Sequence, residues 1–174
     1  MKFFYPTLLG FALCVLSSCS PEPLNPDALV SLEGTWELES ATGTGHNVTH
    51  YKGEEVPATF STRTVSPTDY ALTFTPQGRV FSTGTFTEEV TGTFQGETST
   101  RIREEKKLVG AGVWKLQGRQ LSMGTDHPEE IQLRIVTLSE SELVMEYQNV
   151  FTTESRNGHR IDEEQRVIYI LHRN

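Results

Sequence analysis

The sequence is poor in cysteine and in basic residues, and both shortages narrow the classes of function. Its two cysteines, Cys14 and Cys19, lie in the first twenty residues, so the rest of the chain cannot depend on disulfides for stability. Lysine and arginine number 15 against 23 aspartates and glutamates, for a formal net charge of −8. A chain with this charge and no basic stripe is not expected to bind nucleic acid, nor to dock electrostatically on anionic lipid.

Long helical periodicities are missing as well. Glycine is frequent, with 14 residues, and threonine recurs in nearly every segment, which is typical of an all-β protein. No segment has the alternation of strand and helix that a parallel βαβ unit needs. With 174 residues the chain is long enough for one domain with a proper core, and it gives no clear sign of a second.

The start of the chain reads as a secretory signal. A single basic residue, Lys2, precedes a mainly apolar run, Phe3–Leu16, which is too short for a membrane-spanning helix. The run ends in Leu16-Ser17-Ser18-Cys19, which resembles the lipobox of bacterial lipoprotein precursors. The resemblance implies cleavage before Cys19 and attachment of a lipid such as palmitate to it. Because Ser20 stands where a retention signal has aspartate, it also implies an outer-membrane anchor, facing the periplasm or the exterior.

We therefore predict three parts in the chain. Residues 1–18 are the signal peptide, residues 19–31 are the lipidated N-terminus and a tether, and residues 32–174 are one folded domain. The tether is predicted because residues 21–27 hold three prolines and almost no apolar side chain.

The folded domain is predicted to begin with a strand at Gly34–Ala41 that carries Trp36. An indole ring is too large to leave in water, and its N–H needs a partner once it is buried. We therefore expect Trp36 to close one end of the core. Further along, short segments of alternating apolar and polar residues are separated by turn residues. They amount to eight to ten strands, which close most simply as a single antiparallel up-and-down β-barrel.

Two segments carry more specific expectations. Asn157-Gly158 is the strongest hairpin signal, and a turn there would place Ile168 opposite Tyr147 and Ile170 opposite Met145. Residues 42–69 have no firm assignment, although Asn47–Tyr51 and Glu55–Phe60 would suit a small hairpin. So long an irregular segment is usually a functional lid or mobile.

The spacing of several short motifs resembles the lipocalin-like domain of bacterial lipoproteins, over about residues 32–173. The motifs are Gly34-Thr35-Trp36-Glu37-Leu38, Leu72-Thr73-Phe74, Gly112-Val113-Trp114, Leu121-Ser122-Met123 and Leu143-Val144-Met145. The resemblance implies a calycin-type barrel in which the Trp of the Gly-x-Trp motif, Trp36, packs under an arginine from the end of the last strand. Arg173 is the first choice for that arginine and Arg166 the second. The chain departs from true lipocalins in lacking disulfides and a clear C-terminal helix, and in its longer first connection.

Residue types that carry chemistry are not arranged for catalysis. His46 and His50 stand four apart, as metal ligands on a helix can, but their glycine-containing surroundings argue against a helix and no acidic ligand is near in sequence. Acid pairs such as Glu88-Glu89 cannot form a glycosidase pair, because adjacent residues of a strand point to opposite faces. No serine stands in a nucleophile elbow. We predict no catalytic residue, no metal and no cofactor, and hence that the protein is not an enzyme.

The large apolar side chains bear on binding, because in a small barrel they either fill the interior or line a ligand cavity. Candidate ligand- or core-lining residues are Phe74, Phe81, Trp114, Met145 and Tyr147. The leading hypothesis is an anchored barrel of the cell envelope that binds a small apolar or amphipathic molecule. The alternative is a solid-core structural or accessory module. Such a module would bind an envelope protein or a glycan through Thr42–Asp69 and the charged hairpin Arg101–Lys107.

Overall fold

The computed structural model describes residues 30–65, 68–124, 130–154 and 159–173, and all of its regular elements there are β-strands. The predicted signal peptide, the lipidation site Cys19 and the Asn157-Gly158 dipeptide lie outside the described residues. The strands are β1 (Gly34–Tyr51), β2 (Glu54–Val65), β3 (Ala71–Phe74), β4 (Arg79–Thr83), β5 (Phe86–Phe94), β6 (Glu97–Lys106), β7 (Ala111–Gln117), β8 (Gln120–Gly124), β9 (Ile131–Leu138), β10 (Glu142–Glu154) and β11 (Arg160–His172).

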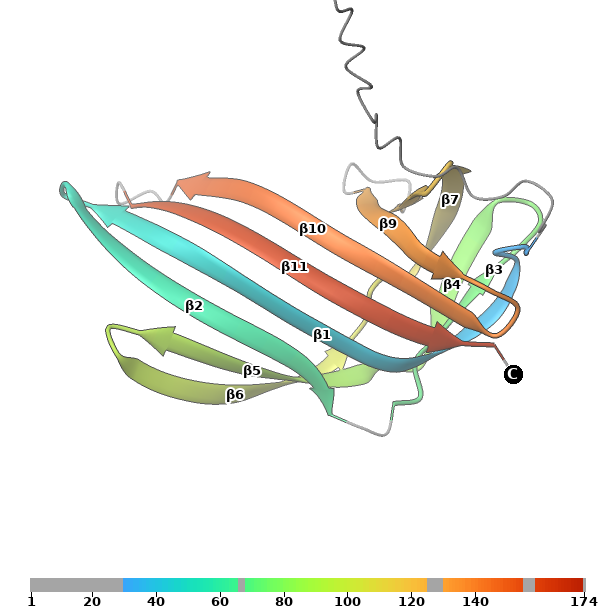
Figure 1. Cartoon of the computed structure of the whole chain (residues 1–174), viewed down its shortest axis with the longest axis horizontal. Helices are drawn as coiled ribbons and strands as arrows, with labels where there is room; N and C mark the ends of the chain where they lie inside the picture. The colour runs from blue at the N-terminus through green and yellow to red at the C-terminus, as the bar shows by residue number, and fades with distance from the viewer. Residues whose placement is uncertain (1–29, 66–67, 125–129, 155–158, 174) are drawn as a thin grey trace, which may run out of the picture.

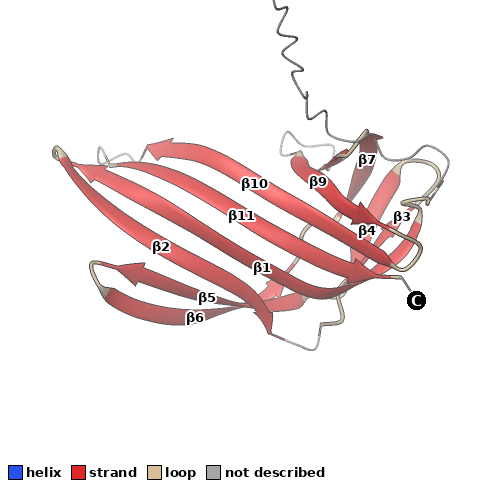
Figure 2. Cartoon of the chain, viewed as in Figure 1, coloured by secondary structure: helices blue, strands red, loops and turns tan. Residues whose placement is uncertain are grey.

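Eight of these strands close into an antiparallel barrel, which confirms the predicted fold class (Figures 1 and 2). The hydrogen-bonded order runs β11-β10-β9-β8-β7-β4-β3-β1, and β1 then pairs with β11 to complete the ring. The up-and-down order is interrupted twice, because β2 lies between β1 and β3 in sequence and the β5–β6 hairpin lies between β4 and β7. These three inserted strands are not part of the ring.

The inserted strands form an extension beside the barrel. The first four residues of β1, Gly34–Glu37, pair with β3, whereas Thr42–Tyr51 pair with β2. At 18 residues, β1 spans roughly 60 Å at 3.3 Å per residue, far longer than a barrel strand needs to be. The C-terminal half of β1 continues beyond the ring together with the N-terminal half of β11 and the C-terminal half of β10. On the other side of β1 the extension carries β2, β5 and β6 (Figure 1). Residues 42–65 are therefore ordered strands rather than an irregular lid.

The barrel interior is filled by side chains. Alternate residues of each ring strand point inward, and one contiguous cluster of buried apolar residues results. Seven members are 0% exposed, namely Trp36, Leu72, Leu121, Met123, Ile135, Leu143 and Met145. A ligand-sized void would leave accessible surface on the side chains that line it, so no such void lies against these seven. The sequence left open whether large side chains fill the barrel or line a ligand cavity. In this part of the barrel they fill it.

Phe81 corrects the list of candidate lining residues. Its side chain is 40% exposed on the barrel exterior, whereas its neighbour Val80 is 1% exposed and points inward. Both residues are apolar, so the alternation alone did not identify which one faces the core. After β4 the chain turns at Gly84, whose φ of +65° favours glycine. Phe86 then points inward. Its ring packs edge-to-face with that of Tyr70, with the two ring centroids 5.4 Å apart.

The predicted register of the last hairpin is wrong by one residue. Tyr147 pairs with Val167 and Met145 pairs with Tyr169, not with Ile168 and Ile170. The ladder ends where Glu154 pairs with Arg160, which leaves the odd number of residues 155–159 between the strands. A two-residue turn at 157–158 would require an even number.

Candidate ligand-binding groove

The end of the barrel at which β1 begins is closed by Trp36. Its Nε1 donates a hydrogen bond to the carbonyl oxygen of Leu32 at 2.8 Å. The guanidinium of Arg173, which the resemblance assigns to this position, lies 4.2 Å from the ring centroid. Arg173 Nη2 also donates to the carbonyl oxygens of Ser31, at 2.7 Å, and Glu33, at 2.8 Å. The arginine thus ties the last strand to the segment before the first, and this end offers no opening for a ligand between those groups.

A groove lies in the extension instead, with a volume of about 300 Å³. It is lined by the face of β1, β2, β5, β6 and β11 that continues the inner face of the barrel. Its apolar part consists of Ala58, Phe60, Val90 and Phe94, and its polar part includes Asn47, Ser99, Arg101, Arg103, Glu163 and Gln165. Phe94 is 50% exposed, which is unusual for a phenylalanine and leaves its ring available to a ligand.

The groove is hollow because small residues occupy the middle of the sheet. One row of paired residues crosses five strands in the order Gln165, Gly45, Phe60, Gly92 and Ser99. Phe60 stands between two glycines, and its ring lies flat over one of them, since a Cβ at Gly45 would come within 2.3 Å of its Cζ atom. The ring therefore forms the floor of the groove rather than standing up into it.

The polar groups of the groove are mostly not committed to other parts of the protein. Arg103 Nη1 lies 3.5 Å from Glu88 Oε2, whose side chain is only 12% exposed. Arg101 and Glu163 form no ion pair and no side-chain hydrogen bond with any described residue. Their charged groups are therefore available to a ligand.

The candidate lining residues predicted from the sequence lie in the barrel and not in this groove. Phe74 and Met145 are buried, with exposed fractions of 1% and 0%. The rings of Trp114 and Phe74 pack edge-to-face, with their centroids 5.8 Å apart. Tyr147 is partly buried against the same core. Phe60 and Arg101 of the groove fall in the two segments that the alternative prediction named as contact surfaces, Thr42–Asp69 and Arg101–Lys107. Phe94 was missed, although the two-residue period of Val90, Gly92 and Phe94 is a signal for one shared face.

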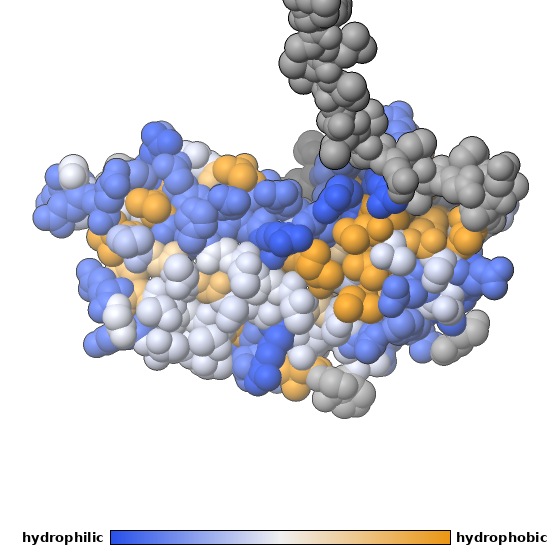
Figure 3. All heavy atoms as spheres, in the orientation of Figure 1, coloured by the Kyte–Doolittle hydropathy of each residue, from blue (hydrophilic) through white to orange (hydrophobic). Residues whose placement is uncertain are grey.

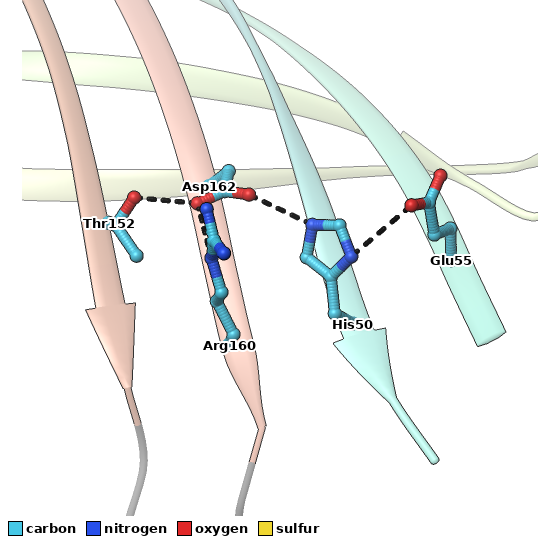
Figure 4. Close-up of polar contacts among 5 residues, drawn as sticks. All are labelled: His50, Glu55, Thr152, Arg160 and Asp162. Atoms are coloured by element: carbon cyan, nitrogen blue, oxygen red, sulfur yellow. Dashed lines mark hydrogen bonds and ion pairs between the residues drawn. The ribbon is translucent and has the colours of Figure 1, made fainter. Parts of the chain in front are cut away.

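On the opposite face of the extension, four strands are joined by a polar cluster (Figure 4). Asp162 accepts hydrogen bonds from Thr152 Oγ1 at 2.6 Å and Arg160 Nε at 3.0 Å, and its Oδ2 lies 2.9 Å from His50 Nε2. The other ring nitrogen of His50 lies 3.5 Å from Glu55 Oε1. The bond from Thr152, first, and those from Arg160 and His50 hold the pKa of Asp162 below its ordinary value.

This cluster cross-links β10, β11, β1 and β2. The hydroxyl of Thr152 donates to the carboxylate of Asp162 and not to the imidazole of His50. Among residues 30–65, 68–124, 130–154 and 159–173, no group of three or more His, Cys, Asp or Glu side chains is arranged to hold a metal ion. His46, the other histidine of the predicted pair, lies 3.8 Å from Glu164.

The hydropathy of the surface differs between the barrel and the extension. Figure 3 shows apolar residues gathered over the barrel, whereas the visible face of the extension is mainly hydrophilic. Within the described ranges, no helix is long and apolar enough to cross a membrane.

The comparison with known families agrees with the closed ring of strands. A family model described as the lipocalin-like domain matches residues 32–145, which begins just before Trp36 and ends within β10. No curated protein and no solved structure gives a match. Because the matched residues make up more than half of the chain and the strands close as that family's barrel does, the chain belongs to the lipocalin-like domain family.

Proposed function

We propose that this lipocalin-like protein is a lipid-anchored protein of the bacterial cell envelope that binds a small amphipathic molecule. The binding site in this proposal is the groove of the extension and not the interior of the barrel. The observation that carries it is the coexistence, in one groove of about 300 Å³, of an exposed phenylalanine ring and charged groups without partners. Small-molecule sites combine an apolar lining with a few placed polar groups in this way, in volumes of about 300–1,000 Å³.

The filled barrel supports the groove as the site. Opening a cavity in the core would mean separating side chains that are 0–1% exposed, at a cost of several kcal/mol for each large side chain displaced. The groove is already open and requires no such rearrangement. Binding there would cover the ring of Phe94, which is worth about 1–2 kcal/mol if most of its exposed surface is removed from water.

The anchoring half of the proposal rests on the lipobox-like Leu16-Ser17-Ser18-Cys19. A lipid on Cys19 would hold the protein at the outer membrane through its N-terminal side. Asn47 of the groove lies eleven residues beyond Trp36 along β1, or roughly 36 Å at 3.3 Å per residue. In this arrangement the groove is at the end of β1 remote from the tether.

Binding is tested by titrating the purified protein with hexyl glucoside and hexylphosphocholine while amide NMR shifts are recorded. We expect saturable shifts at β2, β5 and β6 and not in the barrel core. Phe94→Ser should weaken binding about tenfold, because the ring supplies apolar contact surface. Phe81→Ser is the matched control, since Phe81 is also exposed but lies on the barrel exterior. Equal loss in both variants, or shifts confined to the barrel, would remove the groove from the proposal.

Anchoring is tested by metabolic labelling with an alkyne analogue of palmitate. Label should appear on the wild type and on Cys14→Ser, and should be lost in Cys19→Ser together with sedimentation in the membrane fraction. Label retained in Cys19→Ser would refute acylation at this cysteine.

A further inference from the structure

We infer that the ligand of the groove is zwitterionic, with its anionic group toward Arg101 and its cationic group toward Glu163. This inference rests on the proposed function of the groove and specifies the ligand's head group. It follows from where the charges of the groove stand and from which of them already have partners.

The two uncommitted charges come from opposite sides of the groove lining. Arg101 is on β6 and Glu163 is on β11, which are the two outermost of the five strands that line the groove, in the order β11, β1, β2, β5 and β6. Both side chains nevertheless line the same groove. A ligand seated between them therefore meets a guanidinium on one side and a carboxylate on the other.

The remaining charges of the groove cancel. Arg103 is the third charged residue of the lining, and Glu88 lies beside it at 3.5 Å. One positive and one negative group are then left over. A ligand of a single charge would be attracted by one wall and repelled by the other, whereas a zwitterion of the right orientation is attracted by both.

Uncharged polar groups stand beside the carboxylate of Glu163. Asn47 and Gln165 line the groove next to Glu163, and neither side chain makes a hydrogen bond with a described residue. An amide offers both donors and an acceptor, so these two groups can bind the polar atoms that join the charges of a head group.

The size of the groove suits a compact head group. A cube of about 300 Å³ is roughly 7 Å on a side, at the small end of ligand sites. A phosphate joined by two carbons to an ammonium group fits that span, with Phe60 and Phe94 left to contact a short alkyl chain.

The experiment compares four hexyl amphiphiles that differ only in head group, by calorimetric titration of the purified full-length protein. They are hexylphosphocholine (zwitterionic), hexyl sulfate (anionic), hexyltrimethylammonium (cationic) and hexyl glucoside (neutral). We expect the zwitterion to bind about three- to tenfold more tightly than each of the others, as partly exposed charge pairs allow.

Charge reversal then tests each wall separately. Arg101→Glu should weaken hexylphosphocholine about three- to tenfold and strengthen hexyltrimethylammonium, while Glu163→Lys should weaken the zwitterion and strengthen hexyl sulfate. Glu164→Lys and Lys115→Glu are the matched controls. Glu164 is the next residue on β11 and points to the opposite face, and Lys115 is exposed on the barrel strand β7, so neither should change the order of the four affinities.

The outcomes separate this inference from the proposed function. If hexyl glucoside binds as tightly as the zwitterion and Phe94→Ser weakens both, the groove is a ligand site but its head group is not zwitterionic. If no amphiphile binds, the proposed function fails and this inference fails with it. If charge reversal at residues 101 and 163 has no more effect than the two controls, Arg101 and Glu163 do not bind the charged groups of the ligand.

One further arm identifies the source of the head group. Vesicles of phosphatidylcholine present the same head group in a bilayer. Co-sedimentation that Arg101→Glu abolishes would assign the site to membrane lipid, whereas binding of hexylphosphocholine alone would assign it to a free molecule; both results support a zwitterionic ligand.

Discussion

Removing the side chain of Arg173 should destabilise the protein more than removing any other exposed arginine of the barrel. The loss can be worked out from its contacts. The guanidinium lies 4.2 Å from the centroid of the Trp36 ring, and a cation–π contact of this kind is worth about 0.5–2 kcal/mol. Its two hydrogen bonds to the carbonyl oxygens of Ser31 and Glu33 add about 1.5 kcal/mol each, at the lower end for charged donors because solvent reaches them.

One term opposes these. Arg173 Nε is buried without a hydrogen-bond partner in the described residues, and removing it recovers about 1–2 kcal/mol of desolvation penalty. The net destabilisation expected for Arg173→Ala is therefore about 1.5–4 kcal/mol. Arg173→Lys retains the charge over the ring but not the planar group that serves two carbonyls, so it should lose about half as much.

The assay is urea unfolding followed by circular dichroism, with Arg79→Ala as the matched control. Arg79 is an exposed arginine of β4 whose side chain makes no ion pair or hydrogen bond with a described residue, so its loss should change stability by no more than about 0.5 kcal/mol. A double-mutant cycle with Trp36→Phe should show coupling of at least about 0.5 kcal/mol. If Arg173→Ala matches the control, or if the two substitutions are additive, the ring and the guanidinium do not stabilise each other.

Three other predictions concern individual residues. Gly45→Ala places a Cβ 2.3 Å from the Phe60 ring, so the ring must move and amphiphile binding should weaken roughly fivefold in the same titration. Hydrogen bonds from Arg134 and Arg166 lower the pKa of Glu146 from 4.5. The carboxylate therefore stabilises the protein above about pH 4.5, and this contribution is lost as the pH falls through the lowered pKa. Glu146→Gln should flatten that part of the curve of urea-derived unfolding free energy against pH. The hydrogen bond to Glu39 raises the pKa of His172 above 6.5, so its contribution is complete below about pH 6.5 and lost as the pH rises through the raised pKa. An NMR titration should show His172 titrating above 6.5, and lower in Glu39→Gln.

Much of the barrel could be predicted from the sequence because its signals are local. Tyr70, Leu72 and Phe74 alternate with smaller or polar residues, and all three are at most 1% exposed. The indole of Trp36 could be expected in the core because its size leaves it few other places. These inferences need only the two-residue period of a strand and the cost of leaving a large apolar group in water.

The register of the last hairpin could not be chosen in the same way. The run Val167, Ile168, Tyr169 and Ile170 is apolar at every position. A shift by one residue therefore still places apolar side chains opposite Met145 and Tyr147, and the apolar pattern does not distinguish the two registers. The same ambiguity explains Phe81, since Val80 beside it is equally suited to the core.

The groove could not be predicted because it depends on pairings between strands that are distant in sequence. β4 pairs with β7 across the whole β5–β6 hairpin, and β2 pairs with β5 across two strands of the barrel. An alternating strand accepts either neighbour, so its sequence does not say whether it belongs to the ring or to the extension.

The extension also explains how a barrel with a filled core can still carry an open groove. A closed ring of eight strands is just wide enough to be filled by side chains or to hold one small ligand, and here large side chains fill it. Here β10, β11 and β1 run on past the ring as paired strands, and the inserted strands widen them into a larger sheet. Its inner face continues the barrel's inward-facing residues but is not covered by an opposite wall of the ring. Glycines on this face keep it hollow, and Glu163 and Arg101 stand at its margins. The filled core is thus separate from the groove, and the residues that line the groove can vary without disturbing the core.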